Sequence, residues 1–373
     1  MKKRRNAALP LMIFLGGLLI ILLILYIGTS LYIKLEERNS RSGDVFSGSV
    51  VEGQTGETQN TTDVMPEVVY TQREVDALLE ETVRGQEEAL EAADREGAQR
   101  VLEQLKGDLE SGNTMVESLR PLYPEEIVVV SNGAFHFVPI REDLVHNDYV
   151  QENVEVSENG EIRYLQDGQP ISHKGIDVSK HQGKIDWEKV AADGVEFAFI
   201  RVGLRGYSTG EIVEDEMFEK NIKGAREAGV KVGVYFFSQA ITAEEAREEA
   251  AFVLERIADY PLDCPVVYDV EKVGSSTARM NKLTPEERTE VALEFCRAIE
   301  EAGERVMLYH NMEMATVLSD IGAFEAYDKW FASYSEVLYY PYAYKIWQYS
   351  DKGTVDGISG KVDMNIAFEP VWE

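Results

Sequence analysis

The sequence predicts an α/β fold, namely an irregular (β/α)5β3 TIM-like barrel over residues 171–373. Ahead of the barrel it predicts a transmembrane helix, a helical stalk and a small β module. Two observations predict the barrel. Short apolar runs alternate with helical segments after Ile171, which is typical of a parallel sheet with right-handed crossovers. Eight such runs are present, and eight strands are enough to close a sheet on itself.

Residues 1–33 predict a basic cytoplasmic tip followed by a transmembrane signal anchor. The tip reads MKKRRN, and the run from Ala7 to Ile33 holds no charged residue. About 20 apolar residues span a bilayer, and basic residues on the short side place that side in the cytoplasm. A cleaved signal peptide is the alternative, but SLYIKLEE lacks a small-residue cleavage site. We therefore expect a single-pass cell-membrane protein whose remaining residues are extracellular.

Residues 34–70 predict a disordered linker, and residues 71–121 predict a helical stalk. The linker is rich in Ser, Gly, Thr, Asn and acids, which cannot bury a core. In the stalk, apolar residues recur at helical spacing in two groups. They are Val75, Leu78, Leu79 and Val83, then Val101, Leu102, Leu105 and Leu109. The heptads do not persist over several repeats, so a coiled-coil homodimer and a solvated single helix both stay open.

Residues 122–170 predict a small β module. Strand-like runs surround Asn132-Gly133 and again Asn159-Gly160. Asn-Gly between alternating runs is the strongest short-range signal for a hairpin. The module either binds something or braces the next domain, and nothing in its sequence argues for a ligand.

The strands and helices of the barrel follow from apolar runs and capping signals. Strands are expected at Gly175–Ser179, Glu196–Val202, Val230–Phe237, Pro265–Val270, Arg305–His310, Lys329–Ala332, Lys345–Gln348 and Lys361–Asn365. Helices are expected near Asp186–Asp193, Glu216–Ala228, Ala243–Ala258, Pro285–Ala302 and Met312–Ile321. Thr284 before Pro285 is a good helix start, and Gly229 and Gly303 are good stops.

Composition excludes several classes of protein. The formal net charge of −30 argues against a nucleic-acid partner. Two cysteines, Cys264 and Cys296, cannot staple a disulfide scaffold, and we expect buried thiols with a single bridge as the alternative. The five histidines show no metal-ligand spacing, and no glycine-rich phosphate loop is present. We expect neither a metal nor an organic cofactor.

Four acidic residues stand at the ends of predicted strands: Asp177, Asp269, Glu271 and Asp363. In a parallel barrel the C-terminal strand ends meet at one face, which carries the chemistry. Asp269 and Glu271 are two residues apart and share one side of a strand. Converging carboxylates are what cleavage of a glycosidic bond requires. The alternatives are structural: a helix cap, an Asx turn, or a pair with Lys272.

The region from about residue 173 to residue 370 resembles a glycoside hydrolase family 25 lysozyme, a muramidase. Seven segments carry the resemblance, in order along the chain. They are Asp177-Val-Ser-Lys-His-Gln182, Tyr235-Phe-Phe-Ser238, Asp269-Val-Glu271, Tyr309-His-Asn311, Trp330-Phe-Ala332, Trp347-Gln348-Tyr349-Ser350 and Asp363-Met-Asn365. The resemblance implies a flattened barrel with five helices. It says nothing about residues 34–170.

The resemblance also implies roles for particular residues. Glu271 matches the proton donor, with Asp269, Asp177 and Asp363 as the other active-site acids. We expect the sugar groove to be lined by Tyr235, Tyr309, Trp330, Tyr334, Gln348 and Arg201. Arg201 either pairs with the acids or forms a structural ion pair. The tyrosine-rich stretch 334–344 is either a glycan platform or a packed loop.

The function implied is that of a membrane-anchored extracellular muramidase. It would cleave the β-1,4 bond between N-acetylmuramic acid and N-acetylglucosamine in peptidoglycan by general acid catalysis, with retention, inversion or substrate assistance all open. One alternative is a non-catalytic peptidoglycan-binding or scaffold protein of the cell envelope. Another is a hydrolase of the same fold that acts on a different N-acetylhexosamine polymer.

Overall fold

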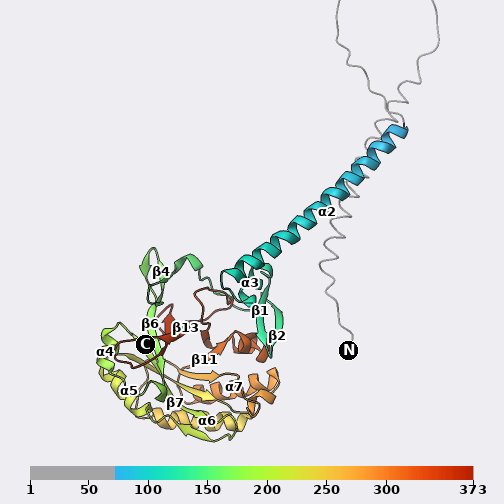
Figure 1. The fold of residues 1–373 in the computed structure, drawn as a ribbon. Coiled ribbons are helices and arrows are strands. Elements are labelled where there is room, and N and C mark those ends of the chain that lie inside the picture. The colour runs from blue at the N-terminus through green and yellow to red at the C-terminus, as the bar shows by residue number, and fades with distance from the viewer. Residues whose placement is uncertain (1–71, 373) are drawn as a thin grey trace, which may run out of the picture. The chain divides into compact units, whose positions relative to one another are not determined.

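A closed sheet of eight strands forms the centre of the computed structural model, which describes residues 72–372 (Figure 1). The predicted signal anchor and the linker 34–70 lie outside the described residues. The strands are β6 (His173–Val178), β7 (Phe197–Arg205), β9 (Lys231–Ser238), β10 (Val266–Val270), β11 (Val306–Asn311), β12 (Asp328–Ala332), β13 (Ile346–Gly353) and β14 (Val362–Ala367). Strand β6 pairs with both β7 and β14, and these pairings close the ring. The eight predicted strands are confirmed.

The last strand departs from the predicted parallel arrangement. Strand β14 runs antiparallel to both of its neighbours, β13 and β6, whereas the other neighbouring strands of the ring are parallel. Only residues 354–361 connect β13 to β14. A parallel neighbour needs a crossover of about a dozen residues or more, so this short connection reverses the chain. The barrel is therefore a mixed sheet, and an unpredicted strand β8 (Ile212–Glu214) pairs antiparallel with β7.

Four of the five predicted helices are present on the outside of the barrel (Figure 1). They are α4 (Trp187–Ala192), α5 (Phe218–Glu227), α6 (Ala243–Ile257) and α7 (Pro285–Glu301). Thr284 caps α7 through a reciprocal capping box with Glu287. Gly229 and Gly303 follow α5 and α7 with φ of 81° and 87°, a backbone conformation that glycine adopts without strain.

The fifth predicted helical segment, near Met312–Ile321, is present but is not a regular α-helix. The chain instead forms a five-residue π-helix, η5 (Met314–Leu318), and then a 3-10 turn, η6 (Ile321–Phe324). Thr316 and Ser319 donate their hydroxyl groups to the main-chain carbonyls of Met312 and Met314. Such local bonds compete with the regular helical pattern.

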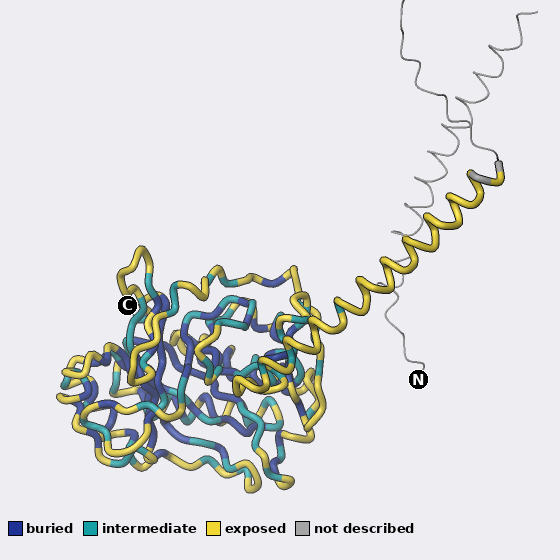
Figure 2. The backbone as a smooth tube through the Cα atoms, turned by 45° about the horizontal axis from the view of Figure 1, so that its top comes forward, coloured by how far each residue is buried: buried dark blue, intermediate teal, exposed yellow. Residues whose placement is uncertain are grey.

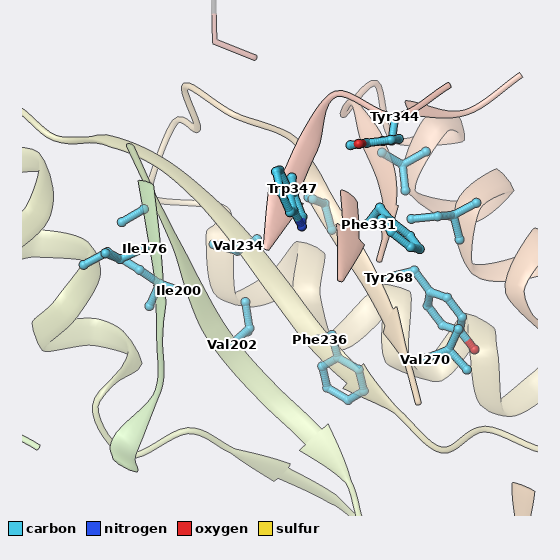
Figure 3. Close-up of a cluster of buried hydrophobic side chains, with 14 of the residues drawn as sticks. Ile176, Ile200, Val202, Val234, Phe236, Tyr268, Val270, Phe331, Tyr344 and Trp347 are labelled. Carbon is cyan, nitrogen blue, oxygen red and sulfur yellow. The ribbon is translucent and has the colours of Figure 1, made fainter. Parts of the chain in front are cut away.

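Two layers of apolar side chains hold the barrel together. Figure 3 shows the outer layer, where Ile176 projects from β6, Val234 and Phe236 from β9, and Trp347 from β13. The inner layer belongs to the alternate residues of the same strands and includes Phe197, Phe199, Met307, Trp330 and Ile346. Strands buried on both faces account for the continuous apolar runs in the sequence. Cys264 and Cys296 are buried free thiols, as expected.

Residues 111–170 form two small sheets rather than one module. Strands β1 (Glu126–Ser131) and β2 (Ala134–Pro139) make a hairpin whose turn holds Asn132 and Gly133 at φ of 52° and 75°. Positive φ at both positions is the signature of the type I′ turn that Asn-Gly favours. Strands β3 (Val154–Val156), β4 (Ile162–Gln166) and β5 (Gln169–Pro170) form the second sheet. A short helix, α3 (Met115–Leu119), precedes the hairpin.

The tyrosine-rich stretch is mostly a docking surface for these N-terminal residues. The Tyr339 hydroxyl accepts a hydrogen bond from the Val128 amide at 2.7 Å. The Tyr342 hydroxyl accepts one from the Arg141 amide at 2.9 Å. Tyr340, Tyr342 and Tyr344 are buried. Of the two alternatives for this stretch, the packed loop holds here.

Helix α2 (Gln72–Glu110) contains 39 residues and exposes almost all of them (Figure 2). Its apolar residues are solvent-accessible too: Leu79 is 54% exposed and Leu102 is 66% exposed. The pairing of this helix with a second copy stays a prediction. No helix within residues 72–372 is long and apolar enough to cross a bilayer.

Candidate active site

The C-terminal ends of the parallel strands surround a cavity of about 360 Å³. All ten residues predicted for the site line this cavity. They are Asp177, Arg201, Tyr235, Asp269, Glu271, Tyr309, Trp330, Tyr334, Gln348 and Asp363. Ser179, His181, Gln182 and Phe237 also line it and were not predicted. Residues spread over nearly 190 positions of the chain are thus neighbours in space.

The four acids reach the cavity by two routes. Asp177 and Asp269 lie near the C-terminal ends of β6 and β10, and Glu271 directly follows β10. Asp363 lies at the beginning of β14, not at its end as predicted. Because β14 is antiparallel, its beginning lies at the same face, where Asp363 is directly opposite Asp177.

Hydrogen bonds from two amides fix the carboxylate of Asp177. Gln348 and Asn365 each donate a side-chain N–H to its Oδ2 at 2.8 Å. Tyr309 donates its hydroxyl to the Gln348 carbonyl oxygen, and the Trp330 indole N–H donates to that of Asn365, both at 2.8 Å. These outer donors orient both amides toward Asp177. Sequence reasoning did not include Asn365, although it shares a strand side with Asp363.

Burial raises the pKa values of the two acids on the paired strands. It raises the pKa of Asp177 to about 6, although Asn365 and Gln348 donate to the carboxylate and oppose the rise. Burial also raises the pKa of Asp363 to about 8, and the charges of Asp177 and Asp351 add to the effect. Crowded, poorly solvated carboxyls resist ionisation, which is how active sites retain a proton near neutral pH.

Asp269 and Glu271 form a second carboxyl pair, and both groups line the same cavity. Burial raises the pKa of Asp269 well above its usual range, and the charges of Glu271 and Asp177 raise it further. Burial and the charge of Asp363 raise the pKa of Glu271. The Gln239 amide donates to the Glu271 main-chain carbonyl at 3.0 Å and holds this segment in place. The arrangement keeps a proton on the pair, as a general acid requires.

Arg201 forms an ion pair with an acid that sequence reasoning missed. Its Nη2 lies 2.7 Å from Oδ2 of Asp215, whose side chain is fully buried. Arg201 also opposes the rise in the pKa of Asp269 by its charge. Its direct partner is thus a structural one, while its charge still acts on the site. Asp215 precedes α5, and no motif in the sequence marked it.

Lys272 does not pair with the neighbouring acids. Its ammonium group lies 2.6 Å from Oε1 of Glu313. The Ser131 hydroxyl, at the turn of the β1–β2 hairpin, donates to the same oxygen at 2.6 Å. The hairpin therefore helps to hold this positive charge beside the segment that carries Glu271.

Trp330 and Tyr334 differ in how they meet the cavity. Trp330 is 1% exposed and stacks on Phe199, so it supports the floor of the site and offers little ring surface to a sugar. Tyr334 is 56% exposed and is the tyrosine of its stretch that faces the cavity. Among residues 72–372, no group of three or more His, Cys, Asp or Glu side chains is arranged to hold a metal ion.

We expect Asp363→Asn to stabilise the protein at pH 9 but not at pH 5. The raised pKa of Asp363 means that the folded state holds this proton more tightly than the unfolded state. The resulting stabilisation is complete below the unfolded-state pKa near 4 and is lost as the pH rises through about 8. The variant does not suffer this loss, and 1 kcal/mol corresponds to about 2–4 °C in Tm.

Thermal unfolding of both proteins at the two pH values checks this expectation. Asp356→Asn, at an exposed position, is the matched control. Equal losses of Tm between pH 5 and pH 9 in the wild type and Asp363→Asn would contradict it.

Comparison with known proteins finds relatives of the barrel region. The model of the family described as "Glycosyl hydrolases family 25" matches residues 176–358. "Uncharacterized protein YegX" of Escherichia coli K12 is 31% identical over 202 residues, which cover 52% of this chain and 68% of that protein. "Autolytic lysozyme" of Clostridium acetobutylicum is 26% identical over 194 residues, or 52% of this chain and 55% of the relative.

Solved structures are similar as well. The modular autolysin LytC from Streptococcus pneumoniae matches with a TM-score of 0.48 and 22% identity, covering 64% of this chain and 57% of that one. A family 25 glycosyl hydrolase from Bacillus anthracis matches with a TM-score of 0.46 and 25% identity, covering 56% and 93%. The chain thus spans little more than half the length of the autolytic lysozyme and of LytC.

Proposed function

The chain belongs to glycosyl hydrolase family 25 and is a glycoside hydrolase, and on this premise we propose that it is a muramidase. The bond that it would cleave is the β-1,4 linkage between N-acetylmuramic acid and N-acetylglucosamine in peptidoglycan. One observation carries the proposal: four carboxyls with raised pKa values meet in one cavity at the catalytic end of the barrel. Similarity to proteins named lysozyme in Clostridium acetobutylicum and Streptomyces globisporus supports the substrate.

Glu271 is the proton donor in the proposed mechanism. Its carboxyl transfers a proton to the glycosidic oxygen as the C–O bond breaks. The negative charge of Asp177, whose pKa of about 6 is lower than that of Asp363, stabilises the developing oxocarbenium character. We favour substrate assistance, in which the 2-acetamido oxygen of the muramic acid attacks the anomeric carbon. Water then attacks that carbon, the bond between the carbon and the acetamido oxygen breaks, and the water gives a proton to the Glu271 carboxylate. Asp177, held by two amides, stays fixed throughout.

The proposed location is the outer face of the cell membrane. The basic tip and the uncharged run Ala7–Ile33 support a single-pass anchor with a cytoplasmic N-terminus. Helix α2, about 60 Å long at 1.5 Å per residue, would act as a stalk. We propose that tethering confines hydrolysis to nearby wall. Protease added to intact protoplasts should remove the barrel but spare an N-terminal fragment.

Product analysis tests the proposed function directly. Purified full-length protein in detergent is incubated with peptidoglycan, and new reducing ends are identified by mass spectrometry. Muramic acid at the reducing end is the expected result. N-acetylglucosamine at the reducing end would keep the hydrolase and overturn the bond assignment. Binding without cleavage would favour the non-catalytic alternative.

A further inference from the structure

A second cavity, of about 770 Å³, adjoins the active site on the side of β6 and α5. Its lining includes Lys180, His181, Lys184 and Lys220, which we call the basic shelf. His181 lines the active-site cavity as well, so the two cavities are neighbours. The shelf gathers three lysines in a chain whose formal net charge is −30.

The positive charge of the shelf is only partly balanced. The Lys180 ammonium lies 3.3 Å from Oε1 of Glu216, which also lines the cavity. Across residues 72–372, neither Lys184 nor Lys220 has an acidic partner within ion-pair distance. The shelf therefore presents free ammonium groups beside a cavity lined by four acids. A ligand that suits both cavities has an uncharged part over the acids and an anionic part over the shelf.

A buried acid fixes the shelf to the active site. Oδ2 of Asp215 accepts hydrogen bonds from Arg201 Nε at 2.8 Å and from the Lys180 main-chain N–H at 3.0 Å. Its Oδ1 accepts one from the Met217 main-chain N–H at 3.0 Å. One side chain thus joins Arg201 in the active site to both main-chain segments of the shelf. Such preorganisation lowers the conformational entropy that these protein segments would lose when a ligand binds.

We propose that the basic shelf binds carboxylates of the peptide attached to muramic acid while the sugar occupies the active-site cavity. This inference rests on the proposed function and adds a substrate class to it. Peptidoglycan has the required pattern, because its sugar rings are uncharged and its stem peptides end in carboxylates. Because His181 lines both cavities, a substituent of a ring in the active-site cavity has only a short distance to cross to the shelf.

The test compares two substrates and two double variants. Soluble glycan–peptide oligomers are prepared with free peptide carboxylates, and a matched batch has those carboxylates converted to methylamides. Lys184→Gln with Lys220→Gln removes the two unpaired charges. Lys106→Gln with Lys189→Gln makes the same change of net charge at exposed residues outside both cavities. Full-length protein in detergent is used throughout.

We expect the shelf variant to raise KM on the free-carboxylate substrate by about three- to tenfold, with kcat unchanged. The lysines lie away from the reacting bond and contribute to binding alone. On the amidated substrate, the wild type and the shelf variant should have the same KM. The control variant should match wild type on both.

Two other outcomes would overturn the inference, and a third would overturn the proposed function on which it rests. Equal KM values for wild type and shelf variant on the free-carboxylate substrate would show that the shelf does not bind peptide carboxylates. The proposed muramidase activity would be unaffected by that result. A defect confined to intact walls that carry phosphate polymers would assign the shelf to those polymers. Absence of cleavage by wild type on either substrate would instead be a failure of the proposed function.

Discussion

Glu271→Gln is expected to lower kcat for peptidoglycan hydrolysis by about 10²- to 10⁴-fold, the usual contribution of general acid catalysis. Glutamine keeps the size and hydrogen-bonding shape of the side chain but has no acidic proton. The main chain at residue 271 stays anchored, because Gln239 donates to the Glu271 carbonyl oxygen and not to its carboxyl. Release of soluble glycan fragments, followed over time, gives kcat and KM.

Two controls separate the loss of an acid from a loss of structure. Glu304→Gln makes the same chemical change at an exposed residue and should keep full activity. An aryl glycoside with an acidic phenol as leaving group needs little protonation, so Glu271→Gln should lose much less activity on it. An equal loss on both substrates would show that Glu271 is not the proton donor, and Asp269 would be tested next.

Glu249→Ala is expected to reduce the free energy of unfolding by about 3–5 kcal/mol, the cost of breaking a buried ion pair. The Glu249 side chain is fully buried, and its Oε1 lies 2.7 Å from Arg205 Nε. Its Oε2 accepts the Ser238 hydroxyl hydrogen at 2.6 Å. Removing the carboxylate leaves the buried Arg205 charge without this partner. Chemical denaturation, monitored by tryptophan fluorescence, measures the change in the free energy of unfolding.

The same arginine provides a matched control. Glu248 also contacts Arg205, at 3.2 Å, but its side chain is 65% exposed. Because exposed pairs contribute about 0–1 kcal/mol, Glu248→Ala should change stability little. Similar losses for Glu248→Ala and Glu249→Ala would show that burial does not set the strength of this network.

Most of the barrel could be predicted because its strands are buried on both faces. A continuous apolar run between two helical segments, such as Pro265–Val270, is typical of a strand in a parallel sheet that helices cover. The direction of β14 could not be predicted from its composition, because a strand has the same apolar pattern in either direction. The short connection, residues 354–361, is what indicates that β14 runs antiparallel to β13. The π-helix was not predicted; hydroxyl bonds of Thr316 and Ser319 to the main chain accompany it.

The acids of the site could be predicted because strand ends converge by a general rule of barrels. The residues that hold those acids could not. Asn365 acts on Asp177 only because β14 and β6 pair in one particular register. Asp215 lies outside every motif and reaches Arg201 through the path of the chain before α5. The docking role of Tyr339 and Tyr342 likewise depends on main-chain groups near residues 128 and 141, which composition does not reveal.

The pairing of β14 with β6 also fixes when activity can first appear during synthesis. The first strand of the barrel lacks one neighbour until residues 362–367 have emerged from the ribosome and, on the proposed topology, crossed the membrane. Asp363 and Asn365 arrive on that strand, and with them arrives one of the two amides that hold Asp177. A nascent or prematurely terminated chain therefore carries no assembled site. On the proposed function and location, the cell wall would thus be protected from cleavage by unfinished copies.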